Sequence, residues 1–313
     1  MYGRELAYVA LVVDDVEAAS GVWEKNFGLR RSEHRVEGRK VPVLGVGQSA
    51  IALFGKGDPY TGGEMRTGVH HIALAVDDPE AAMHAVDKAG VRAESDSAEA
   101  ALDDGKRYLL SLKATDGIRT YLSQRLDRPE AAGGFIERID HLGVVGTNNN
   151  QAIEVFCNAL GCEFRGEQFD TEMQVSTEHF IYKTKDGTQA YMRTRPAEFV
   201  AAVHDLFIGT GDCELEIIQP LNTDANFRAS GDQPGNMKQD HGAIARFLER
   251  NGPGLHHIAF KVKDIDSHLS KFEDSGFRLI DKQGRPGARG SQIGFLHPKS
   301  TAGVLTHFVE RPE

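Results

Sequence analysis

The sequence has few cysteines, and their spacing does not match a structural metal or disulfide motif. Only Cys157, Cys162 and Cys213 are present, all in the second half of the chain and with no CxxC pair. A small disulfide-bonded fold needs more cysteines than this, and disulfides are rare in reducing compartments. We therefore expect no disulfide framework and a cytoplasmic protein.

Long apolar runs and a basic charge balance are also missing. No stretch of about 18 apolar residues occurs, which argues against a membrane-spanning helix. The first residues lack the length and cleavage site of a signal peptide. The formal net charge is −10, whereas binding to nucleic acid or an anionic membrane surface needs a basic face. We expect neither nucleic acid nor membrane as a partner.

What remains is a chain with the composition of a globular protein and a clear internal repeat. It has 313 residues, 40% of them apolar and 26% charged, which is enough for two ordinary domains. The segment HHIALAVDD at 70–78 aligns without a gap with HHIAFKVKD at 256–264. Each continues into a helix-like stretch that ends in glycine, a typical C-cap.

A second, looser pair of repeats begins at Tyr8 and His141. Each again predicts a strand, an amphipathic helix and a terminal glycine. Short β-type runs follow the helices, at 40–46, 50–54, 107–112, 118–122, 180–184, 189–193, 205–208, 213–218, 291–296 and 304–309. The pattern predicts an α+β fold with four βαβββ modules, beginning near residues 5, 68, 137 and 254.

Two modules make up each half of the chain. We predict an N-terminal domain at 1–126, a linker at 127–135 that contains proline and glycine, and a C-terminal domain at 136–313. The second half is longer because of two insertions. One, at 172–203, contains a hairpin-like YKTKDGTQAYM, and the other, at 222–242, precedes a predicted helix at 243–251. Long insertions of this kind are often functional covers or disordered segments.

Four polar residues interrupt apolar strands at matching positions of the second-half repeats. They are His141, Glu216, His257 and His307. Glu214 shares a strand face with Glu216, and two carboxylates in an apolar strand are costly unless they are paired. Imidazole and carboxylate ligands suit a divalent ion such as Co, Ni, Fe, Zn or Mn. Four protein ligands would leave coordination positions open for substrate, as catalytic metal sites do.

The corresponding positions in the first half hold Tyr8, Ala52, His71 and Tyr121. A single histidine with two tyrosines is a poor ligand set for a metal. We therefore predict that the N-terminal domain is degenerate and metal-free. The histidine pair in each half is then typical of the fold, and the residues at the other ligand positions determine whether a metal site forms.

The repeated modules, their pairing and the ligand positions resemble the vicinal oxygen chelate superfamily, which contains glyoxalases, bleomycin-resistance proteins and extradiol dioxygenases. The segments IDHLGVV (139–145), LEIIQPL (215–221), GLHHIAFKVKDID (254–266) and RPGARGSQIGFLHPKSTAGVL (285–305) look closely like methylmalonyl-CoA epimerase. The resemblance implies two tandem glyoxalase-like domains and metal ligation by His141, Glu216 and His257. It also implies proton transfer α to a carbonyl.

The chain departs from that family at the fourth ligand. The family has a glutamate there that binds metal and is implicated in proton transfer, whereas this chain has His307. The resemblance assigns catalytic roles to Glu216 and His307. A second family base, a glutamate before the metal-binding strand, has no clear match. Glu198 is the candidate for it, with Glu178 as the alternative.

An anionic substrate is favoured by a basic stretch at 278–299. This stretch has five basic residues and only Asp281 as an acid, in a chain that is acidic overall. Arg285, Arg289 and Lys299 are the candidate substrate-binding residues. A homodimer is compatible with this layout but is not required, because one chain already holds the pair of modules.

Three functions are consistent with these observations. The first is a metal-dependent isomerase or epimerase acting on an acyl-CoA, keto acid or ketone. The second is an Fe(II)-dependent extradiol-type dioxygenase, although enzymes of that group carry a glutamate where His307 stands. The third is a non-catalytic ligand-binding protein, against which the complete ligand set of the second half argues.

Overall fold

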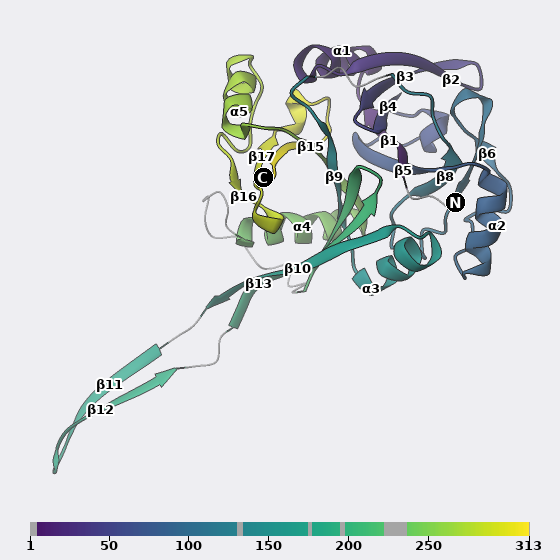
Figure 1. The fold of residues 1–313 in the computed structure, drawn as a ribbon. Helices are drawn as coiled ribbons and strands as arrows, with labels where there is room; N and C mark the ends of the chain where they lie inside the picture. The colour runs from purple at the N-terminus through teal and green to yellow at the C-terminus, as the bar shows by residue number, and fades with distance from the viewer. Residues whose placement is uncertain (1–4, 130–133, 175–176, 195–197, 222–236, 313) are drawn as a thin grey trace.

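Two curled eight-stranded sheets lie side by side in the computed structural model, which describes residues 5–129, 134–174, 177–194, 198–221 and 237–312 (Figure 1). The strand orders are β2-β3-β4-β1-β5-β8-β7-β6 and β10-β13-β14-β9-β15-β18-β17-β16. The two orders are the same when the extra hairpin of the second half is set aside. The predicted α+β fold of paired βαβββ modules in two tandem domains is therefore confirmed.

The first sheet and its helices follow the predicted module order. They are β1 (Leu6–Val13), α1 (Val16–Phe27), β2 (Arg30–Val36), β3 (Arg39–Val46), β4 (Ser49–Gly55), β5 (Gly68–Val76), α2 (Pro79–Lys88), β6 (Glu99–Ala100), β7 (Lys106–Leu109) and β8 (Thr120–Gln124). Two short 3-10 turns lie at η1 (Pro59–Thr61) and η2 (Leu102–Asp104). Strand β2 was not predicted, because its sequence RRSEHRV is largely charged and lies at the edge of the sheet.

The second half repeats this order with additions. Its elements are β9 (Arg138–Val145), α3 (Asn149–Ala152) continued by the π-helix η3 (Ile153–Ala159), β10 (Glu163–Gln174), β11 (Thr177–Thr184), β12 (Gly187–Thr194), β13 (Glu198–Thr210), β14 (Cys213–Pro220), α4 (Met237–Asn251), β15 (Gly254–Lys261), α5 (Ile265–Asp274), β16 (Arg285–Pro286), β17 (Gln292–Leu296) and β18 (Thr306–Glu310), with 3-10 turns η4 (Ala288–Gly290) and η5 (Pro298–Ser300). No helix among these described elements is long and apolar enough to cross a membrane.

The two predicted insertions have different structures. The first forms the hairpin β11–β12, as predicted, and extends away from both sheets (Figure 1). In the second, residues 222–236 lie outside the described residues. The helix expected over 243–251 begins earlier, at Met237, and lies below the second sheet (Figure 1).

One apolar core joins the two halves. In each strand, successive side chains point to opposite faces of the sheet, and the outward-facing residues of both sheets belong to a single cluster of buried residues. Helix α1 of the first half contributes Trp23 and Phe27. The Trp23 ring centroid lies 5.5 Å from that of Phe260, and the Phe27 centroid lies 6.0 Å from that of Phe308. The two halves therefore share one hydrophobic core and do not have separate cores.

Strand register brings the predicted ligands onto the inner face of the second sheet. His141 on β9 pairs with Ala259 on β15, which in turn pairs with His307 on β18. Two residues along β9, Gly143 pairs with both Glu216 on β14 and His257 on β15. Because directly paired residues point to the same face, the four polar side chains converge in one cup.

Candidate metal centre

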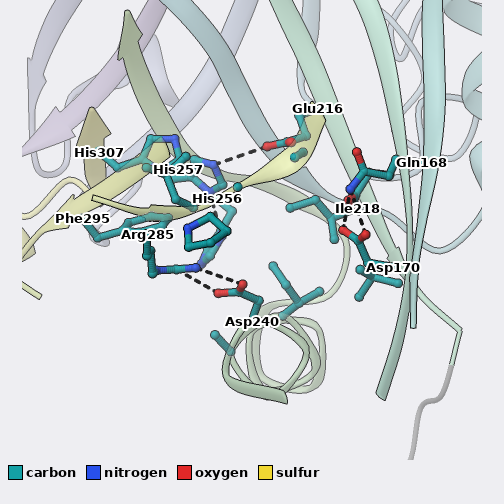
Figure 2. Close-up of a pocket in the computed structure, with 18 of the residues that line it drawn as sticks. Gln168, Asp170, Glu216, Ile218, Asp240, His256, His257, Arg285, Phe295 and His307 are labelled. Atoms are coloured by element: carbon teal, nitrogen blue, oxygen red, sulfur yellow. Dashed lines mark hydrogen bonds and ion pairs between the residues drawn. The ribbon is translucent and has the colours of Figure 1, made fainter. Parts of the chain in front are cut away.

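Three imidazole nitrogens meet at the floor of the second cup. His141 Nε2 lies 3.1 Å from His307 Nε2 and 3.4 Å from His257 Nε2. The carboxylate of Glu216 approaches the same atom, with Oε2 at 2.9 Å from His141 Nε2 and 4.0 Å from His257 Nε2. All four residues are buried, and Figure 2 shows Glu216, His257 and His307 gathered at one end of the cavity. The spacing of these residues along the strands thus produces a compact donor set.

A glycine opposite His257 makes room for this arrangement. A Cβ atom on Gly143 would lie 2.0 Å from His257 Cε1 and 2.2 Å from its Nε2. Any side chain at this position would therefore displace the imidazole. The His257 ring occupies the space that a side chain at position 143 would need, so only glycine fits there.

A buried carboxylate orients His141. Its Nδ1 lies 2.9 Å from Asp140 Oδ1, and Asp140 is also paired with Arg138 and Arg311. Burial alone would raise the pKa of Asp140, but the hydrogen bond with His141 and the Arg311 guanidinium hold that pKa well below its usual range. With Nδ1 directed at a carboxylate, Nε2 is the atom of His141 that faces the cup. Metal-binding histidines usually donate their second ring N–H to a carboxylate, and Asp140 is placed to accept it from His141.

The protonation states of His257 and His307 fit a metal centre, whereas His141 would have to release a proton when a metal binds. Burial would lower the pKa of His141, but the nearby Glu216 and Asp140 carboxylates outweigh it and raise the value to about 9. Burial and the neighbouring rings hold the pKa values of His257 and His307 well below normal. Neutral imidazole is the form that binds metal ions.

The separations of the donor atoms fit as well. Two ligands at right angles around one ion, with bonds of about 2.1 Å, lie about 3.0 Å apart. The observed nitrogen separations of 3.1 and 3.4 Å are close to this value, and three histidines in this part of the chain form a group that could hold an ion. His141, His257 and His307 therefore form a buried potential metal site, with Glu216 beside it.

A cavity of about 430 Å³ opens from this site. Its volume is in the range of small-molecule sites. Ile218, Ile244, Ile293 and Phe295 supply apolar wall, while Arg285 supplies a cation. The cavity thus combines a potential metal site, an apolar wall and one buried positive charge.

Four carboxylates also line the cavity, and helix α4 supplies one of them. Asp240 on α4 accepts hydrogen bonds of 3.1 and 2.9 Å from the Arg285 guanidinium (Figure 2). Asp170 on β10 accepts hydrogen bonds from Gln168 Nε2. Asp205 on β13 is 5% exposed, and its pKa is raised to about 8 by burial and by the negative charges of Glu216, Asp170 and Asp240. The lining of the cavity therefore carries more carboxyl groups than arginine or lysine side chains.

The predicted substrate-binding residues are not all in this cavity. Arg285 lines it. Arg289 is paired with Glu214 and lies 3.9 Å above the Phe207 ring, and Lys299 is exposed on η5; neither lines the cavity. Much of the positive charge at 278–299 is matched by acids from other elements, as in the pair of Lys282 with Glu273. Substrate contact by the three cations stays a prediction.

The predicted second base lies outside the described side chains. Glu198 begins β13, and neither its side chain nor that of Glu178 is described. Sequence reasoning missed Asp140, Gly143, Asp205 and Asp240. An Asp directly before His141 was a visible signal, whereas the contacts of Asp205 and Asp240 depend on elements far apart in the sequence.

The first cup contains a different set of residues at the equivalent register positions. Tyr8 pairs with Ala73, which pairs with Tyr121, while Ala10 pairs with both His71 and Ala52. The predicted equivalences between the halves therefore agree with the strand register.

A guanidinium group lies beside the histidine of this first cup. Arg107 is 2% exposed, and its Nη1 atom lies 3.3 Å from His71 Nε2. Its Cζ atom lies 3.5 and 4.0 Å from the ring centroids of Tyr60 and Tyr121. A permanent cation, held between aromatic rings and paired with Glu99, thus lies beside the histidine that corresponds in register to His257.

Comparison with known proteins places both halves in one family. The Glyoxalase/Bleomycin resistance protein/Dioxygenase superfamily matches residues 5–117 and again residues 140–295. The ethylmalonyl-CoA/methylmalonyl-CoA epimerase of Cereibacter sphaeroides is 31% identical over 174 residues, which is 55% of this chain and 96% of that protein. The uncharacterized protein YqjC of Bacillus subtilis is 27% identical over 175 residues, 56% of this chain and 93% of that protein.

Among solved structures, a mutant 4-hydroxymandelate synthase from Streptomyces coelicolor has the same two-domain fold. The TM-score is 0.62 at 18% identity, covering 99% of this chain and 93% of that one. At this identity the likeness concerns the fold alone. The two family matches, the repeated strand order and the buried histidine site lead to one conclusion: the chain belongs to the Glyoxalase/Bleomycin resistance protein/Dioxygenase superfamily.

Proposed function

We propose that this protein is a divalent-metal-dependent isomerase or epimerase that moves a proton α to a carbonyl of an anionic small molecule, such as an acyl-CoA or a keto acid. The observation that carries the proposal is the convergence of His141, His257, His307 and Glu216 at the floor of a cavity that also contains Arg285. The relative from Cereibacter sphaeroides, named as an acyl-CoA epimerase, supports this class of reaction.

The proposed metal has a defined role at this site. His141, His257 and His307 would hold it, with Glu216 as a fourth ligand, and the bound ion would supply an electrophile that stabilises an enolate oxygen. Co, Ni, Fe, Zn and Mn all suit this donor set. Asp140 fixes the His141 ring, so that Nε2 and not Nδ1 faces the cup.

Arg285 is the proposed anchor for an anionic group of the substrate. Its side chain is 6% exposed and is held by Asp281 as well as by Asp240. The Asp240 side chain is 43% exposed, so this carboxylate would keep contact with solvent if a substrate displaced it from Arg285. A substrate carboxylate would then take its place, with the fork geometry that arginine offers to carboxylates.

A dioxygenase is the second candidate, supported by the three-histidine site and by the fold shared with the 4-hydroxymandelate synthase structure. The two candidates differ in their need for oxygen. The test is to purify the full chain without oxygen, measure bound metals by elemental analysis, and follow α-proton exchange of methylmalonyl-CoA and of 2-keto acids in deuterated water. Oxygen uptake is measured in parallel.

The proposal expects about one metal ion per chain and exchange without oxygen uptake. Iron with oxygen uptake and no exchange would support the dioxygenase, and the absence of bound metal would contradict both. His257→Gln should abolish metal binding and exchange. His71→Gln, at the equivalent position of the first cup, is the matched control and should retain both.

A further inference from the structure

Asp205 is a buried carboxyl in the wall of the cavity that the sequence did not single out. On β13 it pairs with Ile218 of β14 and with Gln168 of β10. These paired residues point to one face, so Asp205 lies on the same inner face as Glu216, two residues along β14 from Ile218. Asp205 is 5% exposed and lines the cavity.

The other carboxylates of this wall have partners, and Asp205 differs from them. Glu216 is bound by His141, Asp240 by Arg285 and Asp170 by Gln168. Within the described part of the chain, Asp205 Oδ1 is buried with no hydrogen-bond partner. A buried polar atom without a partner costs stability and is therefore uncommon in folded proteins. Such an atom in a folded protein calls for an explanation, and a catalytic role is one.

The position of Asp205 relative to Arg285 suggests what that ligand would be. In the second sheet, β13 and β16 lie on opposite sides of the central strands β9 and β15, and the curl of the sheet turns both strands toward the same cavity. A substrate whose anionic group is held by Arg285 would extend over His141, His257 and His307. Its carbon atoms beyond the anionic group would then lie near β13. Glu216 is committed to His141, which leaves Asp205 to face the reacting carbon.

We propose that Asp205 is the group that takes and returns the substrate α-proton, an inference that rests on the proposed function. In its ionised form Asp205 removes the proton from the α-carbon: the C–H bond breaks, an O–H bond forms, and the electron pair moves toward the carbonyl oxygen to give an enolate. Return of a proton from the same carboxyl to the same face rebuilds the C–H bond and exchanges the proton with solvent, while inversion of the α-carbon needs a proton donor on the opposite face. No oxidant or second substrate is needed.

The test compares Asp205→Asn with Asp170→Asn in the metal-loaded full chain. Asp170 lies in the same wall but already has Gln168 as a partner, which makes it a matched control. Asp205→Asn should lower the rate of methylmalonyl-CoA α-proton exchange about 100- to 10,000-fold. Bound metal and the dissociation constant for methylmalonyl-CoA should stay within about twofold, as expected for loss of a proton carrier alone. Asp170→Asn should keep exchange within about threefold, a change too small for the loss of a general base.

A second readout needs no turnover. Because Asp205 leaves an oxygen unpaired, Asp205→Asn should leave the melting temperature of the metal-free protein unchanged or raise it. A melting temperature lowered by several degrees, or loss of metal in this variant, would assign Asp205 a structural role and overturn the inference. Exchange in Asp205→Asn within tenfold of an active wild type would overturn it as well. Failure of the proposed function is distinguishable, since the wild type itself would then show no exchange.

Discussion

Replacing Phe27 by alanine tests whether the two halves share one core. Phe27 on α1 of the first half is fully buried. Its ring centroid lies 5.7 Å from Phe260, 5.0 Å from Phe272 and 6.0 Å from Phe308, all in the second half. Truncating a buried phenylalanine costs about 3–5 kcal/mol. For a chain of this size we expect the melting temperature to fall by on the order of 10 °C.

The assay uses the single tryptophan of the chain. Trp23 packs against Phe260, with ring centroids 5.5 Å apart, so its fluorescence reports on the contact between the halves, while circular dichroism reports on both sheets. In wild type and in Phe27→Ala the two signals should change at the same temperature. Met65→Ala, at a 64% exposed position, is the control and should shift little. Two separate transitions, with only one shifted, would refute a shared core.

Other perturbations act on the metal site and the cavity. Asp140→Asn should weaken metal binding about 10- to 100-fold in a chelator competition; unchanged affinity would contradict the orienting role of Asp140. Because the pKa of Asp140 is depressed, its contribution to stability is complete above about pH 4 and is lost as the pH falls below that value. The difference in unfolding free energy between wild type and Asp140→Asn should therefore shrink from pH 7 to pH 3. Arg285→Met should raise KM for anionic substrates at least tenfold while metal content stays constant, and an unchanged KM would remove Arg285 from substrate binding. Gly143→Ala should reduce bound metal while far-UV circular dichroism is retained, because its Cβ would meet the ring of His257.

The fold was readable from the sequence because each module repeats a local pattern. Apolar strands such as β5 and β15 begin with the same histidine pair, and each leads into a helix. Strand β2 escaped notice, since an edge strand with one exposed face tolerates charge and shows little apolar alternation. Helix α4 began earlier than expected, because its first turn, MKQD, is polar and gives no periodic signal.

The sequence predicted only those site residues that stand at equivalent positions of the repeated modules. His141, Glu216, His257 and His307 could be aligned because strand pairing preserves their positions. The partners of the basic stretch could not, since ion pairs such as Arg285 with Asp240 join elements that the sequence separates by a strand and a helix. Local charge counts therefore overstated the positive charge available to a substrate.

The Arg107 guanidinium of the first cup has a consequence for how the protein depends on its surroundings. A charge attached by covalent bonds cannot be removed by a chelator, exchanged for another ion or depleted by scarcity. The first cup keeps its internal cation wherever the chain folds, held by the Tyr60 and Tyr121 rings. Under the proposed function the second cup acquires its ion after synthesis, so only that half would respond to metal supply.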